Sequence, residues 1–173
     1  MPLPVRGKHV VLRAFRRDDL DALVAGRRDE RPGSRRRLAE LIEHSGGLWR
    51  GRLELAIDAG GRLVGDVQAR QPEHCLPAGV YEIGISLFDP ADRGRGFGRD
   101  AVELVTTHLF SDLDAHRVQA STSVANAPMR AVLRRLGFSE EGVMRGFMAA
   151  EDGTREDFAL YAVTRPEWRP RRS

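Results

Sequence analysis

A segment rich in glycine and arginine, RGRGFG at residues 93–98, lies between a predicted strand and a predicted amphipathic helix. Its alternate glycines let the backbone turn tightly and present successive N–H groups to an anion, and the helix N-terminus adds partial positive charge. Arg93, Arg95 and Arg99 add full charges around it. A dinucleotide fingerprint would need glycine at Arg99, and a P-loop would need Gly-Lys-Ser/Thr. We therefore expect a phosphate-binding loop, with a glycine-rich turn carrying solvated arginines as the alternative.

The cysteine and histidine side chains indicate no further catalytic or metal-binding site. Cys75 is the single cysteine, which excludes an internal disulfide framework and a cysteine-rich zinc site. The five histidines lack paired metal-ligand spacing, so we expect no metal. Cys75 and its neighbour His74 are not expected to form a nucleophilic pair, because adjacent loop residues rarely face one another in attack geometry.

Periodicity predicts the elements that position the loop. Before it, we expect strands at 10–15, 53–58, 63–70 and 80–88, with helices at 17–25 and from Ser34 to Gly46. After it, we expect the loop's own helix, a strand at 117–123, a helix at 129–136 capped by Gly137, and strands at 141–147 and 155–163. Hairpins mixed with helical crossovers predict an α+β fold with both antiparallel and parallel strand pairs.

Length and composition limit the class of protein. The chain has 173 residues, 41% hydrophobic and 31% charged, which fits one domain over 1–173. No apolar run approaches the ~20 residues of a membrane span, and the N-terminus lacks a signal-peptide pattern, so we expect a cytoplasmic protein. The net charge is +3, but the arginines are dispersed among acidic residues, which argues against specific nucleic-acid binding. Two denser clusters, 27–37 and 165–172, are interpreted as solvated surface or as contacts for an anionic partner.

Several motifs in order resemble those of one superfamily. The pattern Arg93, Gly96, Gly98 resembles the acetyl-CoA pyrophosphate loop of the GNAT N-acetyltransferases. Asn126-Ala127-Pro128-Met129 with Leu136-Gly137-Phe138 resembles their second conserved segment. Glu141-Gly142 with Arg145, then Asp157, Tyr161 and Glu167-Trp168, resembles the branch of the ribosomal-protein N-terminal (alanine/serine) acetyltransferases. The resemblance implies a single mixed, mostly antiparallel, twisted sheet of about seven strands, with splayed central strands and about four flanking helices.

The resemblance also implies where acetyl-CoA, the co-substrate, binds. The strand before the loop would pair with the pantetheine arm through the backbone of Ser86, Leu87 and Phe88. Asn126 would touch the arm from a following strand end, and it also suits a helix cap. The pyrophosphate would bind backbone N–H groups of the loop, which are those of Arg93, Gly94, Arg95, Gly96, Phe97, Gly98 and Arg99.

Acetyl transfer to an amine needs a neutral amine and a stabilised oxyanion. We expect the backbone N–H of Leu87 to polarise the thioester carbonyl and Glu82 to act as the base. Asp66 and Glu54 are alternative bases, and Glu82 can also be read as an outward-facing strand carboxylate.

The general acid departs from the family pattern. Leu133 stands where many relatives have a tyrosine, and Met129 stands where a serine is frequent. Ser121, Ser123 and Tyr161 are candidate substitutes, and solvent is a further proton source.

The expected function is acetyl transfer from acetyl-CoA to a primary amine. The acceptor would be a protein or peptide N-terminus, or a small amine such as an antibiotic or polyamine, in a site shaped by segments 26–52 and 71–79. The alternative is a catalytically degenerate acyl-CoA-binding sensor or interaction domain. We expect a monomer or homodimer without membrane partners. Trp49 and Trp168 are expected to be packing anchors.

Overall fold

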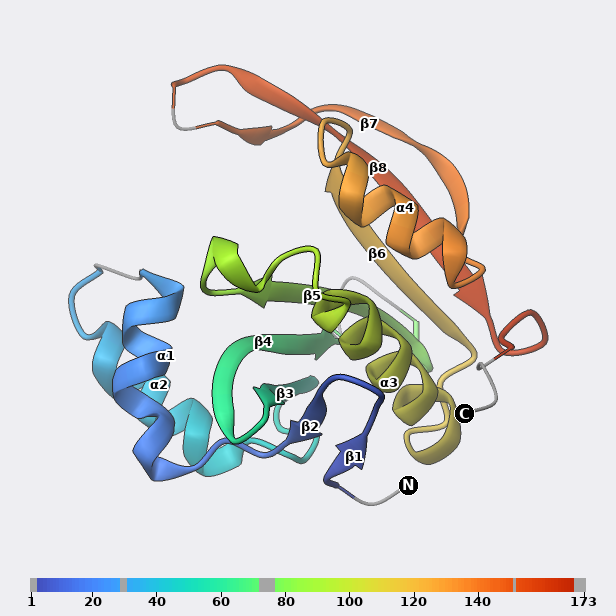
Figure 1. The fold of residues 1–173 in the computed structure, drawn as a ribbon. Helices are drawn as coiled ribbons and strands as arrows, with labels where there is room; N and C mark the ends of the chain where they lie inside the picture. Colours follow the sequence, from blue (N-terminus) through green and yellow to red (C-terminus); the bar gives the residue numbers. More distant parts are fainter. Residues whose placement is uncertain (1–2, 29–30, 72–76, 151, 170–173) are drawn as a thin grey trace.

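The computed structural model describes residues 3–28, 31–71, 77–150 and 152–169. Its strands form one sheet in the order β1-β2-β3-β4-β5-β6-β8-β7, and every neighbouring pair is antiparallel except β5 and β6 (Figure 1). The strands are β1 Val5–Arg6, β2 Val11–Arg13, β3 Arg52–Ala59, β4 Arg62–Arg70, β5 Val80–Leu87, β6 Arg117–Ser123, β7 Ser139–Ala149 and β8 Arg155–Thr164. The predicted mixed, mostly antiparallel sheet is confirmed. The eighth strand is β1, whose two residues are too few to show an alternating pattern.

The α-helices in the described part of the chain number four, as predicted. They are α1 Leu20–Arg27, α2 Ser34–His44, α3 Phe97–Asp112 and α4 Ala127–Arg135. Short 3-10 turns at Arg17–Asp19 and Pro90–Asp92 precede α1 and the loop before α3. Helix α3 is the crossover that joins the parallel strands β5 and β6 (Figure 1).

Alternating strand residues divide the core between the two faces of the sheet. On one face, α3 and α4 pack on the larger apolar cluster, which includes Leu55, Val105 and Leu133. On the other face, α1 and α2 pack on a smaller cluster that includes Leu23 and Ala56. Polar side chains of β3, β4 and β5 share this second face, so the sheet presents its ionisable groups to α1 and α2.

The C-terminus of α4 has the cap that the sequence predicts. Gly137 has φ +86°, and its N–H donates to the carbonyl of Arg134 at 3.0 Å. The N–H of Phe138 donates to the carbonyl of Leu133 at 3.0 Å, and both side chains are in the larger core cluster. These two backbone hydrogen bonds together form a Schellman motif. No helix within the described ranges is long and apolar enough to cross a membrane.

Candidate functional site

Strands β5 and β6 diverge in the middle of the sheet. Their pairing extends only from Val80 with Arg117 to Glu82 with Gln119. Beyond that point β6 pairs with β8 as far as Ser123, while β5 continues beside β4 to Leu87. Figure 1 shows the two strand ribbons diverging in a V from this point, and we call the region between the two backbones the opening. One edge of β5 is therefore available for another extended chain.

The register identifies which backbone groups face this opening. The N–H of Phe88 donates to the carbonyl of Val64 at 3.0 Å, so even-numbered residues of β5 bond to β4. Because antiparallel pairs alternate between bonded and non-bonded, Ile83, Ile85 and Leu87 direct their N–H and C=O groups to the open side. We call these three residues the open edge.

Two of the three residues predicted to pair with an extended ligand do not belong to the open edge. Ser86 lies opposite Asp66, in a pair that bonds to β4. Phe88 bonds to Val64, and its ring packs so closely on α1 that a Cβ on Gly26 would overlap it. Leu87 alone of the three directs its backbone toward β6. The register between β4 and β5 decides which residues of β5 direct their backbone groups away from β4, and the spacing of the motifs does not reveal that register.

The glycine-rich loop ends against the open edge. An ideal Cβ on Gly98 would lie 3.9 Å from Cδ1 of both Ile85 and Leu87. Gly96 is the N-cap of α3 with φ +86°, and no side chain caps the helix. The first hydrogen bond of α3 runs from the N–H of Asp100 to the carbonyl of Gly96. The N–H groups that precede Asp100 in the first turn therefore have no acceptor within the helix.

The loop arginines have different environments. Arg95 donates to the buried carboxylate of Asp92 at 3.2 Å, and its guanidinium lies 4.8 Å from the centroid of the Phe97 ring. Arg62 holds the pKa of Asp92 below its usual range through a bidentate pair at 2.7 and 2.9 Å. Arg93 is exposed. The buried Nε of Arg99 has no hydrogen-bond partner within the described structure.

These features fit a phosphate-bearing ligand. Open N–H groups at a helix N-terminus and an unpartnered buried guanidinium nitrogen are both donors that an anion would satisfy. The alternative of a turn with merely solvated arginines does not explain the buried Arg99 Nε. The loop and the open edge together can hold a ligand with a phosphate at one end and an extended arm at the other.

Glu82 lies on β5 at the last residue that pairs with β6. Its Oε1 accepts from Arg70 at 2.7 Å, and its Oε2 lies 3.4 Å from Nε2 of Gln119. Its side chain is 29% exposed. Glu82 is therefore a partly buried, ion-paired carboxylate at the point where β5 and β6 separate.

The two alternative bases form a separate buried cluster. Glu54 on β3 and Asp66 on β4 are each 6% exposed. The guanidinium of Arg27, at the end of α1, bridges them, with 2.8 Å from its Nη2 to Oε2 of Glu54. Burial raises the pKa of Asp66, although the charge of Arg27 acts in the opposite direction. The bridge was not predictable from the sequence, because 27 residues separate Arg27 from Glu54.

Leu87 and Glu82 are five positions apart on one strand, about 16 Å between backbones in an extended chain. A base at Glu82 therefore suits a reacting carbonyl near Ile83 or Ile85 better than one at Leu87. Asp66 is opposite Ser86 and so lies nearer to Leu87. Two arrangements are thus possible: Glu82 as the base with an N–H donor at Ile83 or Ile85, and Asp66 as the base with the N–H of Leu87.

The candidate acids are distributed over both faces. Leu133 is fully buried in the larger core cluster, as an apolar residue there should be. The hydroxyl of Tyr161 donates to Oε2 of Glu140 at 2.5 Å and accepts from Nε of Arg130 at 3.0 Å. These bonds commit Tyr161 to a structural cluster with α4.

The two serines and Asn126 lie at and beyond the end of β6. Ser121 and Ser123 are half-buried and alternate with the core-facing residues of β6. Ser121 therefore shares the face of Gln119, the neighbour of Glu82. Oδ1 of Asn126 accepts from the N–H of Met129 at 3.2 Å, which confirms the predicted helix cap.

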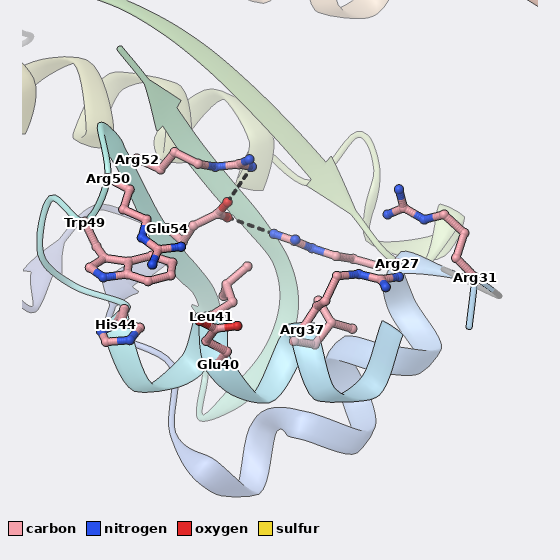
Figure 2. Close-up of a pocket in the computed structure, with 11 residues that line it drawn as sticks. Arg27, Arg31, Arg37, Glu40, Leu41, His44, Trp49, Arg50, Arg52 and Glu54 are labelled. Atoms are coloured by element: carbon pink, nitrogen blue, oxygen red, sulfur yellow. Dashed lines mark hydrogen bonds and ion pairs between the residues drawn. The ribbon is translucent and has the colours of Figure 1, made fainter. Parts of the chain in front are cut away.

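The tryptophans have different roles, and the cysteine lies outside the described residues. Trp168 is 8% exposed and packs on Phe110 and Phe138, as a packing anchor should. Trp49 is half-buried and lines a pocket of about 360 Å³ beside α2, a role that the sequence did not indicate (Figure 2). Cys75 and its neighbour His74 both lie outside the described ranges.

Comparisons with known proteins agree on one family. The model of the acetyltransferase (GNAT) domain matches residues 9–139. Mycothiol acetyltransferase from Pseudarthrobacter chlorophenolicus is 36% identical over 89 residues, which cover 49% of this chain and 26% of the relative. The Bacillus subtilis protein named "Probable N-acetyltransferase YjcK" is 31% identical over 107 residues, which cover 61% of this chain and 57% of the relative. The chain thus matches less than two thirds of the length of these curated relatives.

Solved structures extend the similarity over most of the chain. RimJ from Mycobacterium smegmatis, in complex with CoA-disulfide, has a TM-score of 0.71 and 25% identity, covering 91% of this chain and 83% of that chain. A mutant of the spermidine N-acetyltransferase SpeG from Vibrio cholerae has a TM-score of 0.74 and 20% identity, covering 91% of this chain and 95% of that chain. At that identity the SpeG structure supports the fold alone.

Proposed function

Because this chain belongs to the acetyltransferase (GNAT) domain family, we propose that it transfers an acetyl group from acetyl-CoA to a primary amine. The observation that carries the proposal is the open edge of β5 ending at an uncapped helix N-terminus. An extended arm and a pyrophosphate need these two features side by side. Arg99, whose buried Nε has no partner within the described structure, lies in the first turn of the same helix.

The residues proposed to hold acetyl-CoA follow from this arrangement. The loop from Arg93 to Arg99 would bind the pyrophosphate through backbone N–H groups, with Arg99 as an added cation. The backbone of Leu87 would bond to the arm, and Ile83 and Ile85 extend the same row of groups deeper into the opening. Asn126 would approach the arm from the far side while it caps α4.

When bound, acetyl-CoA supplies the thioester carbonyl that the amine attacks. An open-edge N–H, at Leu87 or Ile85, would stabilise the negative charge that develops on the carbonyl oxygen. Glu82 would accept the amine proton directly or through water, and Arg70 would orient its carboxylate. Asp66 is the second candidate base, because burial raises its pKa toward the range of an effective base.

No covalent enzyme intermediate is needed for this reaction. Most of the rate would come from holding the amine and the thioester together. Because Leu133 is apolar and Tyr161 is bonded to Glu140 and Arg130, the departing thiolate would take its proton from Ser121 or from water.

The branch within the family is a finer proposal. The resemblance of the motifs around Glu141 and Asp157 to the ribosomal-protein N-terminal acetyltransferases supports an acceptor that is a protein or peptide N-terminus. A small amine is the other acceptor class.

An acceptor screen tests the proposal. Thiol release from acetyl-CoA would be followed in the presence of peptides, polyamines and aminoglycosides, with each rate compared with the rate without an amine. Release with at least one amine class, lost in Glu82→Gln, supports transfer. Tight acetyl-CoA binding without release for any acceptor would instead favour a binding domain.

A further inference from the structure

The pocket beside α2 has an excess of positive charge. Five arginines and two glutamates line its volume of about 360 Å³, which gives a formal charge of +3 with His44 neutral (Figure 2). Several of the arginines come from the cluster at 27–37, one of the two that the sequence left open between solvated surface and an anionic partner. The structure brings that cluster together with Arg50, in the turn before β3, and with Arg52, the first residue of β3.

Buried Glu54 fixes two of the guanidinium groups in place. Its Oε2 accepts from Arg27 at 2.8 Å and its Oε1 accepts from Arg52 at 3.0 Å. Arg52 makes this bond and a second one, to Gln68 at 3.0 Å, through the same nitrogen, Nη2. Since a guanidinium has five N–H donors, the Nε and Nη1 groups of Arg52 are directed elsewhere and can serve a ligand.

Arg50 occupies a position where turn geometry favours another residue. Trp49 and Arg52 exchange two backbone bonds at 2.9 Å, and the residues between them, Arg50 and Gly51, have φ of +49° and +68°. Asn-Gly is the preferred pair in such a turn. Arginine there has no conformational advantage. Its guanidinium lies 4.5 Å from the centroid of the Trp49 ring, which holds the charge at the pocket wall.

The pocket opens on the face of the sheet that carries the proposed base. The register aligns Glu54 on β3, Gln68 on β4 and Gly84 on β5. Two strand spacings separate the first from the last, about 10 Å. The same register aligns Arg52 on β3 with Arg70 on β4 and Glu82 on β5, so Arg52 also lies two strand spacings, about 10 Å, from the proposed base. An acceptor that reaches from Glu82 to Arg52 therefore spans about that distance.

The sheet carboxylates of this region already have arginine partners. Glu54 bonds to Arg27 and Arg52, Asp66 bonds to Arg27, and Glu82 bonds to Arg70. A polycationic acceptor would have to displace a guanidinium from each carboxylate. The exposed Glu40 on α2 is the remaining carboxylate that lines the pocket.

We propose that this pocket is the acceptor subsite for an anionic group, so that the amine acceptor carries a carboxylate or phosphate about 10 Å from its nitrogen. The inference rests on the proposed acetyl transfer. Both a small amino acid and a peptide with an acidic side chain near its N-terminus present this chemistry. Arg50 and Arg52 would bind the anion and the opening would receive the amine.

Two matched acceptor series test the charge preference. The small-molecule series is 8-aminooctanoate, octylamine and 1,8-diaminooctane, which share a chain length and differ in end charge. The peptide series is Ala-Ala-Ala-Glu amide with its Gln and Lys counterparts. We expect kcat/KM to be about 10-fold or more higher for the anionic member than for the neutral one, as charge-assisted bonds provide. Which series shows the larger preference identifies the source of the anion.

Variants of Arg50 connect the preference to the pocket. Arg50→Asn keeps the turn and should raise KM for the anionic acceptor about fivefold, with the neutral acceptor unchanged. Arg50→Asp should lower the preference further. Arg36→Gln removes an exposed charge of α2 that does not line the pocket, and it should leave KM unchanged for both the anionic and the neutral acceptor.

The outcomes separate this inference from the proposed function. Thiol release that is equal for all end charges, or unaffected by Arg50→Asp, overturns the anionic subsite while transfer stands. If no amine releases thiol, transfer fails, and calorimetric titration of 8-aminooctanoate into the CoA-bound protein decides the subsite. Weaker binding to Arg50→Asp than to wild type would then support it, and equal or absent binding would overturn it.

Discussion

Gly96→Ala should separate the ligand-binding role of the loop from its structural role. Gly96 has φ +86°, a conformation that costs an L-residue about 1–2 kcal/mol, and an ideal Cβ there lies 3.1 Å from Cδ2 of His9. For a domain of this size we expect Tm to fall by about 2–8 °C. Relief of the contact with His9 would also shift the loop and misalign the N–H groups proposed to bind the pyrophosphate. Loss of one bond to a charged group lowers affinity about 10-fold to 100-fold.

Gly137→Ala is the matched control. Gly137 also has φ +86°, and no atom lies within 4 Å of its ideal Cβ. It caps α4, which is separate from the loop, so its substitution should cost similar stability and leave acetyl-CoA affinity unchanged. Calorimetric titration of acetyl-CoA and thermal melts of both variants measure the two quantities. Equal acetyl-CoA affinities in the two variants would refute the phosphate-binding role of the loop.

Three further predictions concern the base, the acid position and acid stability. Glu82→Gln should lower kcat by about 10²-fold with little change in acetyl-CoA affinity. If the variant keeps the wild-type rate at every pH, Asp66 becomes the candidate base, and Asp66→Asn would test it. Leu133→Tyr should cost ~1–3 kcal/mol of stability from overpacking and leave turnover within a few-fold of wild type. A gain in turnover of about 10²-fold would instead indicate that the wild-type chain lacks a general acid, and it would favour the sensor alternative. Hydrogen bonds from Tyr161, Arg134 and Arg130 together lower the pKa of Glu140 from 4.5 to about 2, so the ionised carboxylate stabilises the fold above about pH 4.5 and loses this effect as the pH falls toward 2. Glu140→Gln should therefore flatten the fall of Tm between about pH 5 and about pH 3, and an unchanged slope would contradict the assignment.

Local sequence patterns determined the elements and the loop. The predicted strand at 117–123 has the observed bounds, and the α4 cap at Gly137 forms the expected bonds. The RGRGFG segment was readable because its glycines and its helix start are contiguous in the chain. Periodicity and turn chemistry act over a few residues, so a single sequence contains them in full.

Only the tertiary structure decided which groups meet across the sheet. Backbone parity on β5 depends on its pairing with β4, and it selects Leu87, and not Ser86 or Phe88, for the open edge. The Arg27 bridge joins α1 to β3 and β4. The basic pocket likewise combines the 27–37 cluster with the turn before β3. These contacts depend on strand register and helix docking, which are set by packing between segments distant in sequence, and residue type and spacing do not encode them locally.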